Sequence, residues 1–171
     1  MTTRIVTSAV YRFVMFLIQF AIFTVDTENI CYEDGCCLRR RKGKNMLVTD
    51  FYEEKNCNTS IELIEALKTR SKTQSNEFEL RTDSDYPYMT ILIKNEYACV
   101  HFFDETNECG YYAYSENNDF KDDFIIFNIS SETSETEISK DLVISVEQAY
   151  EIAIEFFKSL KRSNTVKWFE L

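Results

Sequence analysis

The chain has 171 residues, of which 44% are hydrophobic, and a formal net charge of −10, which suits one globular domain with a sizeable core. The charge is unevenly distributed. Residues 1–45 carry seven Lys/Arg and four Asp/Glu, a net charge of +3, whereas residues 46–171 carry twelve and twenty-five, a net charge of −13. A body this acidic repels nucleic acid and attracts basic partners, so we expect it to bind no nucleic acid.

The first 45 residues form an extension with two features. Residues 9–25 are almost entirely apolar but fall short of the roughly 20 residues that a membrane span needs, and no cleavage site follows them. Residues 39–44 are a basic cluster directly before Met46. Purine-only codons can encode such a cluster, and a ribosome-binding site is also purine-rich. We therefore expect that translation begins at Met46 and that the protein is cytoplasmic. An inner-membrane anchor and a basic binding patch are the alternatives.

The first predicted elements of the body are a helix and five strands. Ile61, Leu63, Ile64 and Leu67 recur at helical spacing after a possible cap at Asn58, Thr59 or Ser60, which predicts three to four helical turns. The period then changes to that of short aromatic and β-branched strands. We predict strands at residues 77–81, 88–94, 97–104, 110–115 and 124–130.

The clearest signal lies near the C-terminus. Residues 140–144 predict a short strand, and Ser145 with Gln148 has the spacing of a capping box at the start of a helix over residues 145–162. Residues 165–171 close the chain as a strand. The sequence therefore predicts an α+β fold, in which two main helices pack on an antiparallel sheet of about six to seven strands in the order α, β meander, α, β.

No motif predicts an enzyme, a metal site or a cofactor. His101 is the one histidine, and it shares a strand face with Cys99 and Phe103. Because residues two apart on a strand are separated by roughly 6.5–7 Å, a direct Cys–His dyad is disfavoured. The cysteines lack the paired spacing of a zinc site, and those of the body fit reduced thiols. We expect His101 and Trp168 to be packing residues.

Carboxylates cluster in two predicted loops. We predict that they bind a basic protein partner, with solvated loops as the alternative. The predicted partner-binding residues are Asp104, Glu105, Glu108, Glu116, Asp119, Asp122 and Asp123. The aromatic residues of the strands either pack in the core or, on an exposed sheet face, anchor such a partner. They are Phe102, Phe103, Tyr111, Tyr112 and Tyr114.

The C-terminal third resembles the end of the Imm1 family of bacterial immunity proteins, which has a short strand, an Ala-rich helix ending in Phe, a polar bend and a Val-x-Trp strand. The matching residues are Ala149, Ala153, Phe156 or Phe157, Val166 and Trp168. Gly110 looks like the family's Gly-led strand, and the opening of the body, residues 46–69, is also similar. The bend at residues 162–165 lacks the proline that members often carry, so a neighbouring immunity family with the same layout is the alternative.

The resemblance covers residues 46–171 and implies a function. Immunity proteins of this kind bind the C-terminal domain of a polymorphic toxin, often a nuclease or a nucleic-acid deaminase, and block it. The resemblance and the acidic charge both indicate a non-catalytic protein that neutralises a toxin. The rival hypothesis is a small regulatory or adaptor domain that residues 9–25 anchor to a membrane.

Overall fold

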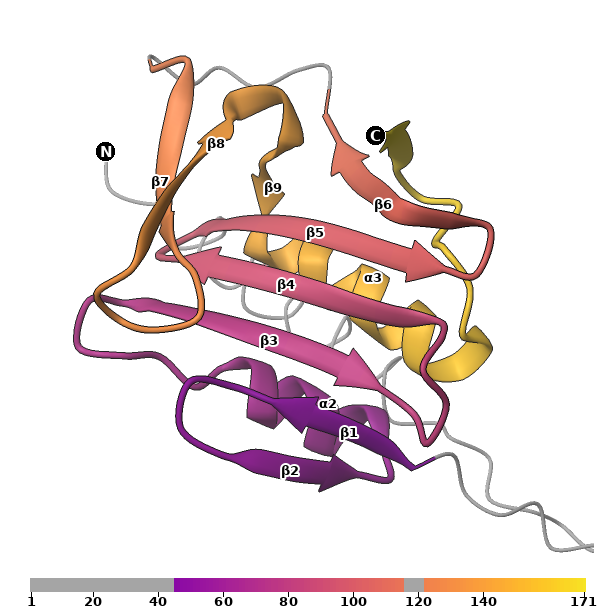
Figure 1. The fold of residues 1–171 in the computed structure, drawn as a ribbon. Helices are drawn as coiled ribbons and strands as arrows, with labels where there is room; N and C mark the ends of the chain where they lie inside the picture. The colour runs from indigo at the N-terminus through magenta and orange to yellow at the C-terminus, as the bar shows by residue number, and fades with distance from the viewer. Residues whose placement is uncertain (1–44, 116–121) are drawn as a thin grey trace, which may run out of the picture. The chain divides into compact units, whose positions relative to one another are not determined.

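A computed structural model describes residues 45–115 and 122–171, which belong to one compact unit spanning residues 41–171 (Figure 1). The apolar run at residues 9–25 and the basic cluster at residues 39–44 lie outside the described residues. Among the helices of the described part of the chain, none has the length and apolar character that crossing a membrane requires.

The main sheet has eight strands, and all of its pairings are antiparallel. Seven of them lie in the order β10 (Lys167–Glu170), β6 (Asn107–Tyr114), β5 (Tyr97–Asp104), β4 (Tyr88–Lys94), β3 (Ser75–Arg81), β1 (Met46–Thr49) and β2 (Glu54–Cys57). The short strand β9 (Ile144–Ser145) pairs with the start of β5 on the edge that β6 uses farther along.

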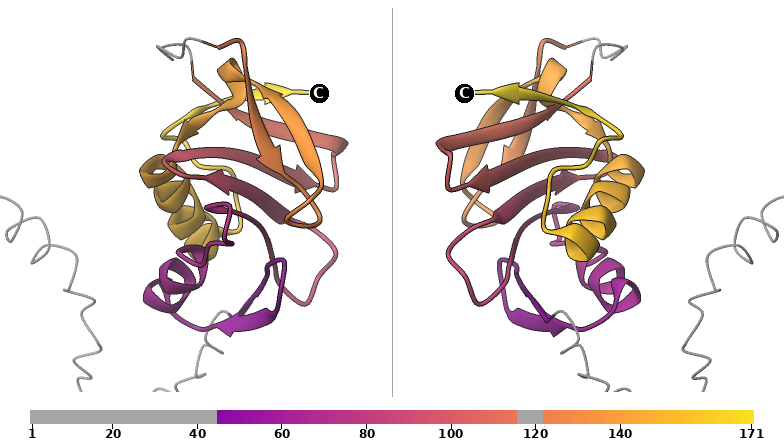
Figure 2. Two further views of the ribbon diagram at one scale, coloured as in Figure 1. Left: turned by 90° about the vertical axis from the view of Figure 1, so that its left-hand side faces the viewer. Right: turned by 90° about the vertical axis from the view of Figure 1, so that its right-hand side faces the viewer.

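Two helices, α2 (Ser60–Leu67) and α3 (Val146–Ser159), cover one face of the sheet (Figure 2). Thr59 caps α2 by accepting a hydrogen bond from the amide of Glu62. Ser145 and Gln148 form the predicted capping box of α3. The main core lies between these helices and the alternate strand residues that face them, and its largest fully buried side chains include Phe78 and Phe156.

A two-stranded ribbon, β7 (Phe124–Asn128) with β8 (Glu135–Ser139), lies on the opposite face of the sheet (Figures 1 and 2). Phe127 of the ribbon is fully buried in a second, smaller core with Leu92, Cys99 and Val143. The helices and the ribbon therefore sandwich part of the sheet between them.

The predicted α+β fold is confirmed, with more strands than expected. The bounds predicted for β4 and β5 are those observed, whereas β1, β2 and β8 were not predicted. Within the described residues, a strand pair therefore precedes α2. Met46 opens β1, and its side chain is buried in the main core.

Two local predictions were wrong. Residues 140–144 are not one strand, because Lys140–Leu142 forms a 3-10 helix, η1, closed by a hydrogen bond from the Val143 amide to the Lys140 carbonyl. The first helix has 8 residues rather than three to four turns. The side chain of Arg70 folds back and donates hydrogen bonds to the carbonyls of Leu67 and Thr69. The carbonyl of Leu67, the last residue of the short helix, therefore has a hydrogen-bond partner.

Candidate functional site

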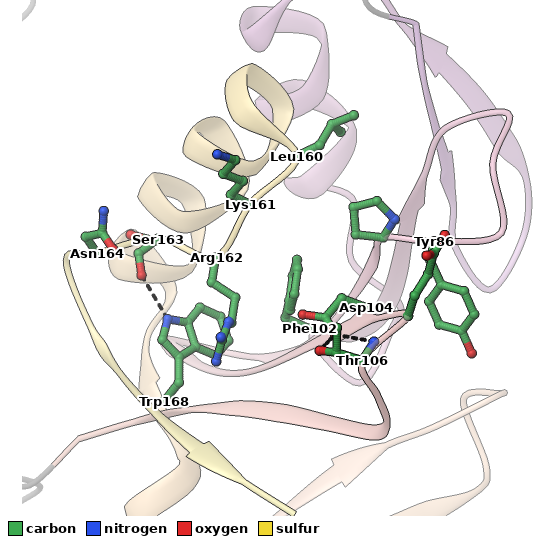
Figure 3. A pocket seen from close by; sticks show the side chains of 12 residues that line it. Tyr86, Phe102, Asp104, Thr106, Leu160, Lys161, Arg162, Ser163, Asn164 and Trp168 are labelled. Atoms are coloured by element: carbon green, nitrogen blue, oxygen red, sulfur yellow. Dashed lines mark hydrogen bonds between the residues drawn. The ribbon is translucent and has the colours of Figure 1, made fainter.

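A cavity of about 710 Å³ lies beside the predicted acidic turn between β5 and β6. Figure 3 shows it between the chain that follows α3 on one side and Tyr86 with the β5–β6 turn on the other. Phe102 and Trp168 contribute aromatic walls. The cavity could not be predicted from the sequence, because side chains from three separated segments of the chain meet here.

Asp104 sits at the cavity with its carboxylate already engaged. It accepts hydrogen bonds from the backbone amide and the hydroxyl of Thr106, two residues along the turn. The bond from the Thr106 hydroxyl is the largest cause that lowers the pKa of Asp104, and the positive charge of Arg162 lowers it further. Asp104 therefore keeps its negative charge at neutral pH, and the neighbouring Glu105 is exposed.

The cavity carries basic residues as well. Lys161 and Arg162 line it together with Asp104 and Glu105, so its charged lining contains two residues of each sign. The guanidinium carbon of Arg162 lies 3.7 Å from the centre of the Tyr111 ring, a cation–π contact. The negative charge of the turn is therefore partly compensated within the protein itself.

Trp168 has the packing role that was predicted for it and also lines the cavity. Its indole nitrogen donates a hydrogen bond of 2.8 Å to the Ser163 carbonyl, which fixes the bend before β10. Its ring packs edge-on against Phe102 with 6.1 Å between ring centres. Trp168 is half-buried and packs against the main core.

The second group of predicted binding residues lies elsewhere. Asp122 and Asp123 are exposed just before β7, and Lys140 forms an ion pair of 2.9 Å with Asp123. A strand of eight residues, β6, separates them from the β5–β6 turn, a span of about 25 Å at the usual rise per residue. The structure therefore does not bring the two acidic groups together.

Three predicted residues lie wholly or partly outside the described part of the chain. Glu116 and Asp119 lie outside the described residues, and the backbone of Glu108 belongs to β6 while its side chain is not described. Binding of a partner by the acidic loops remains a prediction for Asp104, Glu105, Asp122 and Asp123.

His101 is a packing residue in a row of stacked rings on the face of the sheet away from the helices. Its ring lies 3.9 Å from those of both Phe103 and Tyr112. Its Nε2 donates a 2.8 Å hydrogen bond to the Cys109 carbonyl. Burial lowers the pKa of His101 and outweighs the effect of that hydrogen bond. Cys99 is buried in the smaller core, where burial raises the pKa of its thiol to about 12, so no dyad forms.

The other predicted aromatic residues divide between the two faces of the sheet. Phe102 and Tyr111 are buried in the main core under the helices. Phe103, Tyr112 and Tyr114 are half-buried on the opposite face. This division follows the alternation of side chains along a strand.

The described residues contain no group of three or more His, Cys, Asp or Glu side chains that could hold a metal ion. The three cysteines of this part of the chain, Cys57, Cys99 and Cys109, are free thiols.

Comparison with known proteins identifies a relative whose whole length aligns with part of this chain. No family model matches the chain. Over 127 residues it is 31% identical to the double-stranded DNA deaminase immunity protein of Burkholderia cenocepacia (strain H111). The match covers 74% of this chain and 100% of that protein. This protein therefore belongs to the family of that deaminase immunity protein.

Proposed function

We propose that this protein is an immunity protein that binds and neutralises a cognate toxin, and that the toxin is a nucleic-acid deaminase. The observation that carries the proposal is the match along the entire length of an immunity protein whose name specifies a double-stranded DNA deaminase. Neutralisation by binding needs no catalytic group in the inhibitor.

The charge of the body supports this mode of action. A deaminase that acts on nucleic acid needs a basic surface for its substrate, and residues 46–171 carry a net charge of −13. Opposite charges speed association and penalise wrong partners. We infer a basic C-terminal toxin domain as the partner, contacted through exposed acidic residues that include Asp104, Glu105, Asp122 and Asp123.

The assignment to the Imm1 type is a finer part of the proposal. It is supported by a layout in which Gly110 lies in β6, the capped helix α3 leads through a polar bend, and Trp168 lies in the closing strand. A neighbouring immunity family would share these features. The proposal of toxin neutralisation is independent of which of the two names applies.

We also propose that residues 46–171 bind the toxin and that residues 1–45 are an extension. We place the protein in the cytoplasm. The placement of Met46 at the start of β1 supports the boundary, because the fold uses this residue as part of its core. The free thiols of Cys57, Cys99 and Cys109 suit a reducing compartment.

The direct test is inhibition of the toxin domain encoded by the reading frame directly upstream of this gene. We expect the purified protein to abolish deamination of double-stranded DNA by that domain at a molar ratio of about one, and the two to elute together from a sizing column. Full deaminase activity in the presence of excess protein, with separate elution, would refute the proposal.

A further inference from the structure

Strand β7 departs from the pattern expected of a ribbon that packs one face against the protein. An antiparallel ribbon with one packed face should alternate apolar residues inward with polar residues outward. Strand β8 does so, since Ile138 faces the sheet while Glu135 and Glu137 point outward and are exposed. In β7 both faces are apolar.

The two outward residues of β7 are large and exposed. Phe124 is 55% exposed and Ile126 is 43% exposed, whereas the alternate residue Phe127 is fully buried. A conflict of this kind between local pattern and environment is expected where a surface has a function, because solubility alone would favour polar residues. Phe124 and Ile126 thus form an apolar strip on the outer surface of the ribbon.

The ribbon presents this strip on a fixed support. Its inner face is held by the smaller core, in which Ile125 and Ile138 pack beside Phe127. At its tip, Asn128 accepts a 2.7 Å hydrogen bond from the Ser75 hydroxyl and is itself buried. A surface held in place before binding loses little conformational entropy when a partner docks.

Carboxylates surround the strip. Glu137 lies directly opposite Ile126 in the strand register, and Glu135 follows on the same outward face. Asp122 and Asp123 precede Phe124 in the chain and are exposed. Lys140, which pairs with Asp123, is a nearby basic residue. The strip therefore fits a partner segment that carries both apolar and basic side chains, and a second copy of this acidic body would be repelled.

We infer that the outer face of the β7–β8 ribbon, formed by Phe124, Ile126, Glu135 and Glu137, docks the toxin. The inference rests on the proposed function and adds the surface and the chemistry of the partner segment. Phe124 and Ile126 supply the apolar anchor at the centre of the contact, and the carboxylates guide a Lys- or Arg-bearing segment onto it.

The test measures binding of the full-length protein to the toxin domain from the upstream reading frame, made catalytically inactive for handling. The double variant Phe124→Ser/Ile126→Ser should raise the dissociation constant by about 100-fold. Ile61→Ser is the matched control, because Ile61 is 73% exposed on α2 and lies far along the chain from the ribbon. It should bind like the unaltered protein, within about twofold.

A charge variant tests the second part of the inference. Glu135→Gln/Glu137→Gln should slow association by about tenfold at low salt and make the association rate less sensitive to added salt. All substituted side chains are exposed, so thermal unfolding of each variant should match that of the unaltered protein.

The outcomes separate the two levels of the proposal. If the unaltered protein binds the toxin domain and the Ser double variant binds equally well, the ribbon inference is refuted and the proposed function stands. If the unaltered protein itself fails to bind the toxin domain, both the proposed function and the ribbon inference are refuted. A loss of affinity in the double variant, with the Ile61→Ser control unchanged, supports both.

Discussion

Gly110 lies close to His101 and Phe103 in the sheet, and replacing it with alanine should destabilise the protein. Its φ of +79° lies in the region that residues with a side chain rarely adopt. An added Cβ would lie 2.6 Å from His101 Nε2, 2.7 Å from the Phe102 carbonyl oxygen and 2.9 Å from Phe103 Cδ1. One of these neighbours is backbone in the middle of the sheet, so it cannot simply rotate away.

The expected cost has three contributions. An alanine at positive φ costs about 1–2 kcal/mol, and inserting a methyl group into a packed site costs about 1–3 kcal/mol. Alanine also restricts the unfolded chain, which offsets about 0.4–1 kcal/mol. We therefore expect Gly110→Ala to lower the free energy of unfolding by about 1–4.6 kcal/mol.

Urea unfolding followed by tryptophan fluorescence measures this loss, because Trp168 is the one tryptophan of the chain and packs against the main core. Asn95→Ala is the control. Asn95 has a φ of +54° in the β4–β5 turn, so this change should cost about 1 kcal/mol from backbone strain. If Gly110→Ala costs no more than Asn95→Ala, the three close contacts relax freely and the reasoning is refuted.

Three further predictions concern the cap, the histidine and the thiols. Ser145→Ala removes the cap of α3 and should lower the free energy of unfolding by about 1 kcal/mol in the same urea assay; no change would show that the capping box adds nothing. Burial lowers the pKa of His101, so the unfolded chain binds the proton more tightly and stability should fall as pH drops below the ordinary value of 6.5. Urea unfolding of His101→Gln at several pH values should show a weaker fall, and an identical pH profile would contradict the assignment. Iodoacetamide at mildly alkaline pH should alkylate the exposed Cys109 in the folded protein and spare the buried Cys99, whose pKa is raised to about 12. Peptide mapping by mass spectrometry measures the labelling of each thiol. Equal labelling of the two cysteines would contradict the prediction.

Strongly patterned elements could be predicted from the sequence. Strands β4 and β5 consist of long aromatic and β-branched runs separated by a two-residue turn, and both were predicted with their observed bounds. The start of α3 was predicted because its cap is encoded by two residues, Ser145 and Gln148, at fixed spacing. In each case the structure depends on interactions between residues close in the chain.

The missed strands have weak sequence patterns or depend on distant partners. Strand β2 reads Glu-Lys-Asn-Cys, which has no apolar alternation, and it becomes a strand by pairing with β1. Strand β1 also pairs with β3, which lies about thirty residues farther along the chain than β1. The cavity could not be predicted for the same reason, since Tyr86, Asp104 and Arg162 meet only after the sheet and α3 have packed.

The same dependence explains why the acidic residues could be recognised but not ranked. By sequence, Asp104 with Glu105 and Asp122 with Asp123 are equivalent carboxylate pairs in loops. In the structure, the first pair lines a cavity with Lys161 and Arg162, whereas the second adjoins a ribbon that adds Glu135 and Glu137 and exposes an apolar strip. A partner guided by charge and anchored by apolar contact would find both requirements at the ribbon, where Lys140 pairs with Asp123 but Glu135 and Glu137 are exposed.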